Sequence, residues 1–153
     1  MYFYNLIKEL ANKKDILLFV DMDGVIAAYN SRNNPYDFLN KRPLTQNIAT
    51  IKEVCSIKNV EINILSVCRE DSQINDKNVW LDKYAPFFEK DNRTIISRES
   101  KEWKTSKEIK LDFLKDIKTD KQIVVVDDDN EILRALHEEL GHIIALQDSE
   151  LID

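Results

Sequence analysis

The chain has 153 residues, with 22 basic and 28 acidic side chains and a formal net charge of −6, so we expect one domain that spans residues 1–153. It holds only two glycines, Gly24 and Gly141, which are too few and too far apart for either glycine-rich phosphate-binding loop. The acidic balance argues against broad, sequence-independent binding to nucleic acid, which relies on basic patches.

The first half of the chain predicts helices and strands in alternation. Apolar residues spaced i, i+3, i+4 and i+7 predict a helix from Phe3 to Leu10, and the apolar run Ile16–Val20 predicts a buried strand. A second helical pattern opens at Pro43 and Thr45, and the strand-like segment Val60–Leu65 comes after it.

The second half continues this alternation. Residues 71–84 predict a helix that Pro86 ends, and Thr94–Ser97 predicts a short strand. The remaining expected elements are a helix that Ser106 caps, a strand at Ile123–Val126, a helix from Ile132 to Leu140 that Gly141 ends, and a strand at Ile143–Leu146. This order predicts a single α/β domain around a five-stranded parallel sheet.

Three of the expected strands end in groups that phosphate chemistry uses. Asp21-Met22-Asp23-Gly24-Val25 follows the first strand, Ser66 the second and Asp127-Asp128-Asp129 the fourth. Ligands of parallel sheets bind beyond the carboxyl ends of the strands. Asp21 and Asp23, two residues apart in extended chain, point to the same side and could share one substrate atom. Clustered carboxylates repel one another, so we expect them to hold a Mg²⁺ ion.

Each of these features also has a structural interpretation. Asp-x-Asp after a strand is often a turn or a helix cap. Asp127–Asp129 could form the solvated start of the last helix, whose dipole favours carboxylates, and Ser66 could be a cap. These groups are expected at the same edge of the sheet, and this shared position favours a functional site over separate turns and caps.

With these motifs in place, residues 16–146 resemble the haloacid dehalogenase superfamily. The resemblance rests on DMDGV after the first strand, a serine after the second, a lysine upstream of the fourth strand and VVVDD at its end. It implies a three-layer sandwich with little or no cap domain. It also implies a phosphatase that acts through an aspartyl phosphate and uses Mg²⁺ as its cofactor.

The resemblance implies roles for individual residues. Asp21 would be the nucleophile, Asp23 the general acid and base, and Ser66 a hydrogen-bonding partner of the phosphoryl group. Asp21, the backbone carbonyl of Asp23 and Asp128 would bind Mg²⁺, and Asp127 would orient these ligands.

Four lysines precede the fourth strand and could neutralise the phosphoryl oxygens: Lys101, Lys104, Lys107 and Lys110. We expect Lys110 to do so, because it lies where the helix toward that strand should begin. Lys107 is the alternative if the helix begins one turn earlier. The other lysines would lie on a solvated helix face.

A narrower resemblance links the chain to the 5′(3′)-deoxyribonucleotidases, through DMDGV, the KxxWL segment Lys77–Leu81 and VDD. Trp80 within that segment is expected to pack in the core. The chain departs from this subfamily in its second motif, LSVCR, and in the short insertion after Asp23. Only Ala27–Pro43 remains to cover the site, and its polar sequence predicts a loop and therefore an open site.

The function expected from these features is a Mg²⁺-dependent phosphomonoesterase whose substrate is a phosphorylated small molecule such as a nucleotide. A nucleic-acid end or a phosphoprotein is an alternative substrate, and Arg32 and Arg69 would contact the rest of it. Two other interpretations are a receiver-like signalling domain and a non-catalytic phosphate-binding module. A second copy of the chain could enclose the open site, as a homo-oligomer.

The cellular location of the protein is predicted from the length of its apolar runs and from the charged residues near its N-terminus. The longest apolar runs are much shorter than the roughly 20 residues of a membrane span, and charged residues near the N-terminus break any signal-peptide pattern. We therefore expect a soluble, cytoplasmic protein. Cys55 and Cys68 are expected to be reduced thiols.

Overall fold

A computed structural model of the chain describes residues 2–29 and 37–152. Five parallel strands form one sheet in the order β3-β2-β1-β4-β5. The strands are β1 (Ile16–Val20), β2 (Val60–Cys68), β3 (Arg93–Ser97), β4 (Gln122–Asp127) and β5 (Ile144–Gln147). The α-helices are α1 (Tyr2–Ala11), α2 (Thr45–Val54), α3 (Ser72–Tyr84), α4 (Ser106–Lys115) and α5 (Asn130–Glu139). The predicted α/β class and the five-stranded parallel sheet are confirmed.

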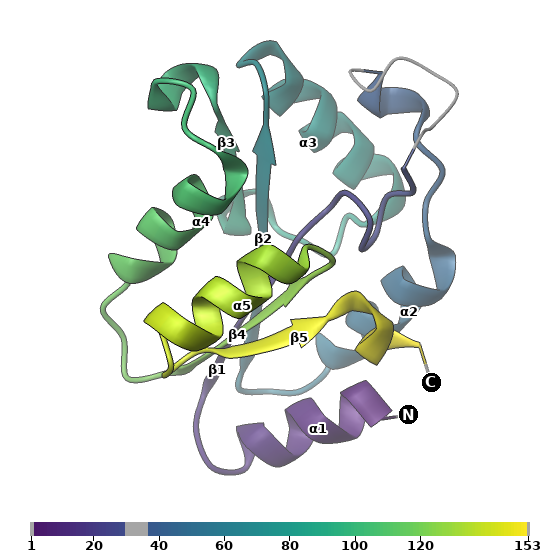
Figure 1. Cartoon of the computed structure of the whole chain (residues 1–153). Helices are drawn as coiled ribbons and strands as arrows, with labels where there is room; N and C mark the ends of the chain where they lie inside the picture. The colour runs from purple at the N-terminus through teal and green to yellow at the C-terminus, as the bar shows by residue number, and fades with distance from the viewer. Residues whose placement is uncertain (1, 30–36, 153) are drawn as a thin grey trace.

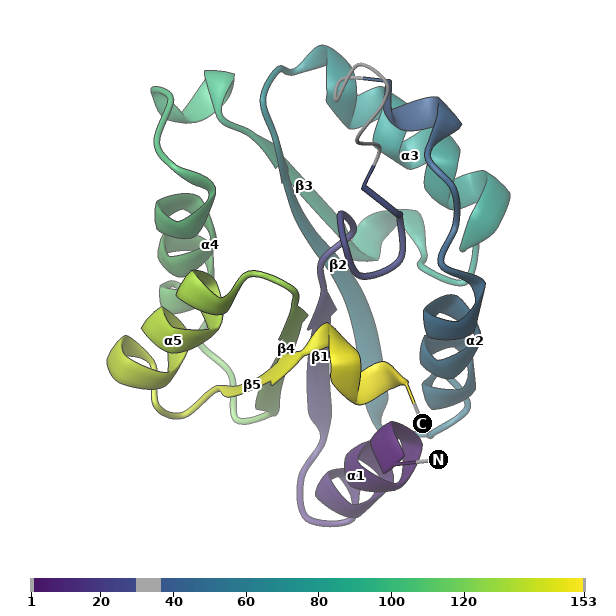
Figure 2. The same cartoon turned by 45° about the vertical axis from the view of Figure 1, so that its right-hand side comes forward.

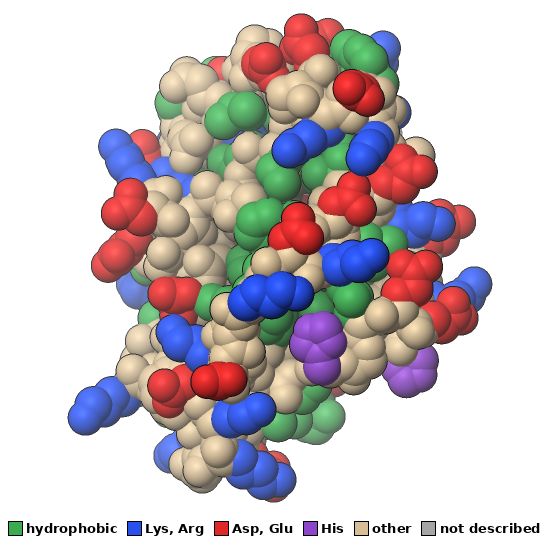
Figure 3. Space-filling view, turned by 90° about the vertical axis from the view of Figure 1, so that its left-hand side faces the viewer, with side chains coloured by type: hydrophobic (Ala, Val, Ile, Leu, Met, Phe, Trp, Pro, Cys, Tyr) green, Lys and Arg blue, Asp and Glu red, His purple; other side chains and the backbone are tan. Residues whose placement is uncertain are grey.

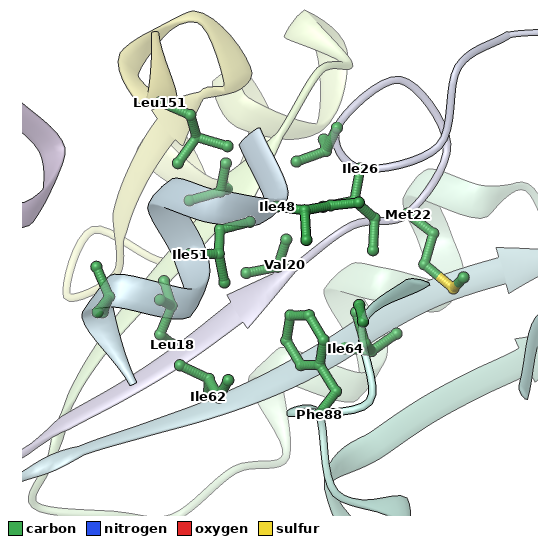
Figure 4. Close-up of a cluster of buried hydrophobic side chains, with 14 of the residues drawn as sticks. Leu18, Val20, Met22, Ile26, Ile48, Ile51, Ile62, Ile64, Phe88 and Leu151 are labelled. Atoms are coloured by element: carbon green, nitrogen blue, oxygen red, sulfur yellow. The ribbon is translucent and has the colours of Figure 1, made fainter. Parts of the chain in front are cut away.

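The sheet is the middle layer of three (Figures 1 and 2). Helices α1, α2 and α3 cover one face, and α4 and α5 cover the other. Successive strand residues point to opposite faces, so Leu18 and Val20 belong to one buried cluster, and Leu17 and Phe19 to the other. Figure 4 shows the first of these clusters, in which Ile51 of α2 lies over β1.

No cap domain is present in the described part of the chain. Between β1 and α2 it contains one short 3-10 turn, η1 (Phe38–Asn40). In the described part of the expected loop Ala27–Pro43 two side chains nevertheless pack inward, since Phe38 is 3% and Lys41 is 7% exposed. None of the described helices has the length and apolar character needed to cross a membrane.

The register of the sheet aligns the ends of β1 and β4, while β2 continues four residues beyond the partner of Val20. Val20, the last residue of β1, is paired with Ile64 of β2 on one side and with Val126 of β4 on the other. The backbone N–H of Asp21 donates to the carbonyl of Val126 at 3.0 Å. Residues that follow Val20 and Val126 therefore begin side by side, which brings the first and last acidic motifs together.

Two helix ends differ from the prediction. Thr105, not Ser106, caps α4: its hydroxyl accepts from the backbone N–H of Glu108, and its own N–H donates to that glutamate side chain. This reciprocal pair is a capping box, which leaves Ser106 as the first helical residue. Gly141 follows the end of α5 as expected, but among the described residues Gly24 is the only glycine with a positive φ, so Gly141 is not a left-handed cap.

The surface over α4 and α5 carries charges of both signs. Figure 3 shows acidic and basic side chains interspersed on this face. A sequence-independent nucleic-acid surface needs a stripe or patch of basic residues. The face shown in Figure 3 carries no such stripe.

Candidate functional site

The site begins in a tight turn after β1. The carbonyl of Met22 accepts from the backbone N–H groups of Val25, Ile26 and Ala27 at 2.9–3.2 Å. Gly24 within this turn has φ +79°, and a Cβ added there would lie 2.6 Å from Cγ of Asp128. Only glycine fits this position without strain, so the turn holds the first motif directly against the last.

Asp21 is a buried carboxylate that shares a lysine with Asp127. Lys110 Nζ lies 3.1 Å from Asp21 Oδ1 and donates to Asp127 Oδ2 at 2.6 Å. Burial raises the pKa of Asp21 to about 6, although the charge of Lys110 acts in the opposite direction. Burial alone would lower the pKa of Lys110, but the two carboxylates outweigh it and raise that pKa. Lys110 is therefore held as a cation beside Asp21.

The structure distinguishes the four candidate lysines, although not for the reason given by the sequence. Helix α4 begins at Ser106, so Lys110 lies in its middle rather than at its start. Lys110 is 3% exposed and faces the site, whereas Lys101, Lys104 and Lys107 are exposed. Lys110 remains the residue that we predict to contact the phosphoryl group.

Asp23 has different partners from Asp21. Its Oδ1 accepts from Lys41, and its Oδ2 accepts from Lys77 Nζ at 3.0 Å. Lys77 also donates to Ser66 Oγ at 2.6 Å and to the carbonyl of Val67 at 3.3 Å. Burial acts to raise the pKa of Asp23, but the two lysines outweigh it, so that this pKa is lowered.

Ser66 lies near this acid, but not in the place predicted. Strand β2 continues to Cys68, so Ser66 lies inside the strand instead of after it. It is fully buried, and its hydroxyl accepts a hydrogen bond from Lys77. The side chain of Ser66 therefore reaches the site from within β2, because side chains along a strand point alternately to its two faces and Ser66 points to the face that α3 covers.

Lys41 and Lys77 are site residues that the sequence reasoning did not identify. For Lys77 the sequence offered only its place at the start of the KxxWL segment Lys77–Leu81, which does not indicate a contact with Asp23. Lys41 lies in irregular chain and carries no such pattern. Trp80 packs in the core as predicted, with its ring centroid 5.8 Å from that of Phe38.

Three carboxylates form a cluster that could hold a metal ion. One oxygen from each of Asp21, Asp127 and Asp128 lies within 4.8 Å of the others. Hard divalent cations such as Mg²⁺ prefer oxygen ligands of this kind, so the residues present fit that ion. The hydroxyl of Tyr29 donates to Asp128 Oδ2. The side chain of Asp23 belongs to the lysine pair and not to this cluster.

Asp129, Arg69 and Arg32 are the remaining residues that the sequence analysis considered. The side chain of Asp129 accepts from the backbone N–H of Glu131 at 2.9 Å and caps α5, so the structural interpretation of the acidic triplet holds for this residue. Arg69 is exposed just beyond β2, and its guanidinium lies 5.9 Å from the ring centroid of Trp103. Arg32 lies outside the described residues.

Comparisons with known proteins find likeness at the level of the fold. No family model matches the chain, and no curated protein matches it. A chain in a solved structure of the Pnkp1/Rnl/Hen1 RNA repair complex is similar with a TM-score of 0.69 and 20% identity, over 88% of this chain and 42% of that one. In a second structure of the Pnkp1/Rnl/Hen1 complex the TM-score is 0.71 and the identity 19%, over 88% and 46%. This chain thus spans less than half of either neighbour, and it shares their fold over that span.

Proposed function

We propose that the protein is a Mg²⁺-dependent phosphomonoester hydrolase that acts through an aspartyl phosphate on Asp21. The observation that carries this proposal is the separation of two neighbouring carboxylates into different environments. Asp21 lies with Lys110 and the acidic cluster, whereas Asp23 lies between Lys41 and Lys77. Different environments for paired carboxylates favour different roles for them, here nucleophile and proton carrier.

In the first step a carboxylate oxygen of Asp21 attacks the phosphorus, and the bond from phosphorus to the ester oxygen breaks. Asp23 gives a proton to the departing oxygen. The lysines favour ionised Asp23, but an approaching phosphate dianion favours its protonated form, since like charges disfavour ionisation. Lys110 and Ser66 would stabilise the phosphoryl oxygens as their charge is redistributed.

In the second step Asp23, now a carboxylate, takes a proton from water. The water oxygen attacks the phosphorus of the aspartyl phosphate, the bond from phosphorus to Asp21 breaks, and inorganic phosphate leaves. Mg²⁺ bound by Asp21 and Asp128, with Asp127 beside them, would supply the positive charge that lets a phosphate dianion approach these carboxylates.

The test is the hydrolysis of an aryl phosphate by purified protein. We expect phosphate release to require Mg²⁺ and to be inhibited by Ca²⁺, whose larger coordination shell misplaces the nucleophile. Asp21→Asn should abolish turnover, and Asp129→Asn, the same change at an exposed helix cap, should preserve it. Full activity in excess chelator, or wild-type kcat in Asp21→Asn, would show that the mechanism is wrong.

For the substrate we propose a nucleotide or a phosphorylated nucleic-acid end. Two observations support this choice: the resemblance of DMDGV and Lys77–Leu81 to the deoxyribonucleotidases, and the fold shared with a chain of an RNA repair complex. A series of nucleotides, sugar phosphates and 3′- or 5′-phosphorylated oligonucleotides tests it. Preference for a sugar phosphate or a phosphopeptide would contradict it.

A further inference from the structure

Lys41 is a buried lysine with hydrogen-bond donors to spare. Its side chain is 7% exposed, and an ammonium group has three N–H donors. Among the described residues its Nζ donates to one acceptor, Asp23 Oδ1. Lys77 differs, because its Nζ donates to Asp23, Ser66 and the carbonyl of Val67. Lys41 therefore keeps two donors for an anionic ligand, at a position where an unsatisfied ammonium is costly.

The two lysines divide the carboxylate of Asp23 between them. Lys77 donates to Asp23 Oδ2 and to Ser66 Oγ. The proposed function requires the phosphoryl group on this side, next to Ser66. Lys41 contacts the opposite oxygen, on the side that the proposed function leaves for the departing alcohol. Hydrogen bonds of ~2.8 Å from ester oxygen to Asp23, from Asp23 to Lys41, and from Lys41 to an anion keep that anion within roughly 10 Å of the ester oxygen.

Lys41 is also held in place before any ligand binds. Its carbonyl accepts from Trp80 Nε1 at 3.0 Å, and its Nζ lies 4.8 Å from the ring centroid of Phe38. The Phe38 and Trp80 rings pack edge to face. An ammonium fixed in this way loses little side-chain freedom on binding, which favours selectivity between ligands.

We propose that Lys41 forms a subsite for a second phosphate group on the alcohol part of the substrate. This inference rests on the proposed function and narrows its substrate class. The preferred substrate is a phosphomonoester whose alcohol carries another phosphate within roughly 10 Å of the ester oxygen. In a nucleoside 3′-phosphate this group would be a 5′-phosphate, and in the 3′-phosphorylated end of a nucleic acid it would be the adjoining phosphodiester.

The kinetic test compares three substrates: a nucleoside 3′-monophosphate, the corresponding 3′,5′-bisphosphate, and a 3′-phosphorylated dinucleotide. In the wild type we expect kcat/KM to be roughly 10-fold or more higher for the substrates with a second phosphate, as for a charge-assisted hydrogen bond. Lys41→Met should reduce this ratio toward one. Arg42→Met, which removes an exposed neighbouring charge, should keep it. Preference for the bisphosphate alone indicates a small-molecule substrate, and preference for both indicates a nucleic-acid end.

A binding measurement separates this inference from the proposed function. Calorimetric titration of the mono- and bisphosphate into Asp21→Asn, with and without Lys41→Met, reports the subsite without turnover. If this preference depends on Lys41 while the wild type hydrolyses none of the three substrates, the result supports the subsite and contradicts the hydrolase.

Two results would overturn the subsite. The first is equal kcat/KM and equal affinity for mono- and bisphosphate in the wild type, which needs no variant. The second is a Lys41→Met variant in which kcat/KM falls by the same factor for all three substrates, which would mean that Lys41 acts only through Asp23. Lys41→Gln is a second neutral variant if Lys41→Met does not fold, and it should reduce the same ratio. Lys41→Arg retains the charge and should retain part of the preference.

Discussion

Replacing Asp21 by asparagine should stabilise the metal-free protein at neutral pH. Burial raises the pKa of Asp21 from 3.8 to about 6 even though Lys110 is adjacent. A raised pKa means that the folded chain binds this proton more tightly than the unfolded chain does. Stability is therefore lost as pH rises from 3.8 to about 6, and the loss is complete above that range. The free-energy equivalent is about 3 kcal/mol.

Asparagine has nearly the shape of aspartate and carries no charge at any pH. Asp21→Asn should therefore gain up to about 3 kcal/mol over the wild type at pH 7.5 and almost nothing near pH 3.5. Urea unfolding in excess chelator at both values measures this difference. Mg²⁺ should then stabilise the wild type more than Asp21→Asn, because an ion bound at the carboxylate cluster offsets its repulsion.

The control for this experiment is Asp129→Asn, since Asp129 is exposed and asparagine is an equally good helix cap. Its stability should follow that of the wild type at both pH values. An Asp21→Asn protein that is less stable than the wild type at pH 7.5 would refute this prediction. A difference in stability between the two proteins that is the same at pH 3.5 as at pH 7.5 would refute it as well.

The remaining predictions concern activity, packing and substrate size. Lys110→Ala should lower kcat roughly 10²-fold or more, whereas Lys107→Ala should change it little; similar mild losses in steady-state assays of both variants would contradict this assignment. Gly24→Ala should cost ~2–4 kcal/mol in urea unfolding, because it places a Cβ against Asp128 on a left-handed backbone. Nucleotides should exceed simple monophosphates in kcat/KM, since remote contacts can stabilise the transition state; a flat series would refute this prediction.

The order of elements could be predicted because the central strands have an unambiguous pattern. Ile16–Val20 and Ile123–Val126 are continuous apolar runs, and both are buried on two faces. The end of β2 could not be predicted in the same way. Val67 and Cys68 continue the strand because they pair with Ile96 and Ser97 of β3, and that pairing depends on a segment nearly thirty residues away.

The acidic residues of the site could be predicted, and two of its lysines could not. The aspartates could be predicted as a set, because acidic motifs follow two strands whose carboxyl ends meet at the same edge of a parallel sheet. A lysine is ordinarily solvated, so neither Lys41 nor Lys77 differs by residue type from the exposed lysines around it. Their burial follows from Asp23, which lies 18 residues before Lys41 and 54 before Lys77, and no local pattern records such a contact.

The central place of β1 has a consequence for motion in the site. The amide of Asp21 is bonded to the carbonyl of Val126 in β4, directly after a strand that has a neighbour on each side, so its hydrogen should exchange with solvent only when the whole domain unfolds. The chain that brings in Lys41 is joined to the first motif by few backbone bonds, such as Ala28 N–H to the carbonyl of Arg42, and its amides should exchange through smaller openings. The half of the site that would make and break bonds to phosphorus is then anchored in the most protected part of the protein. The segment that carries Lys41 should open more often than β1, and these openings leave Asp21 in place.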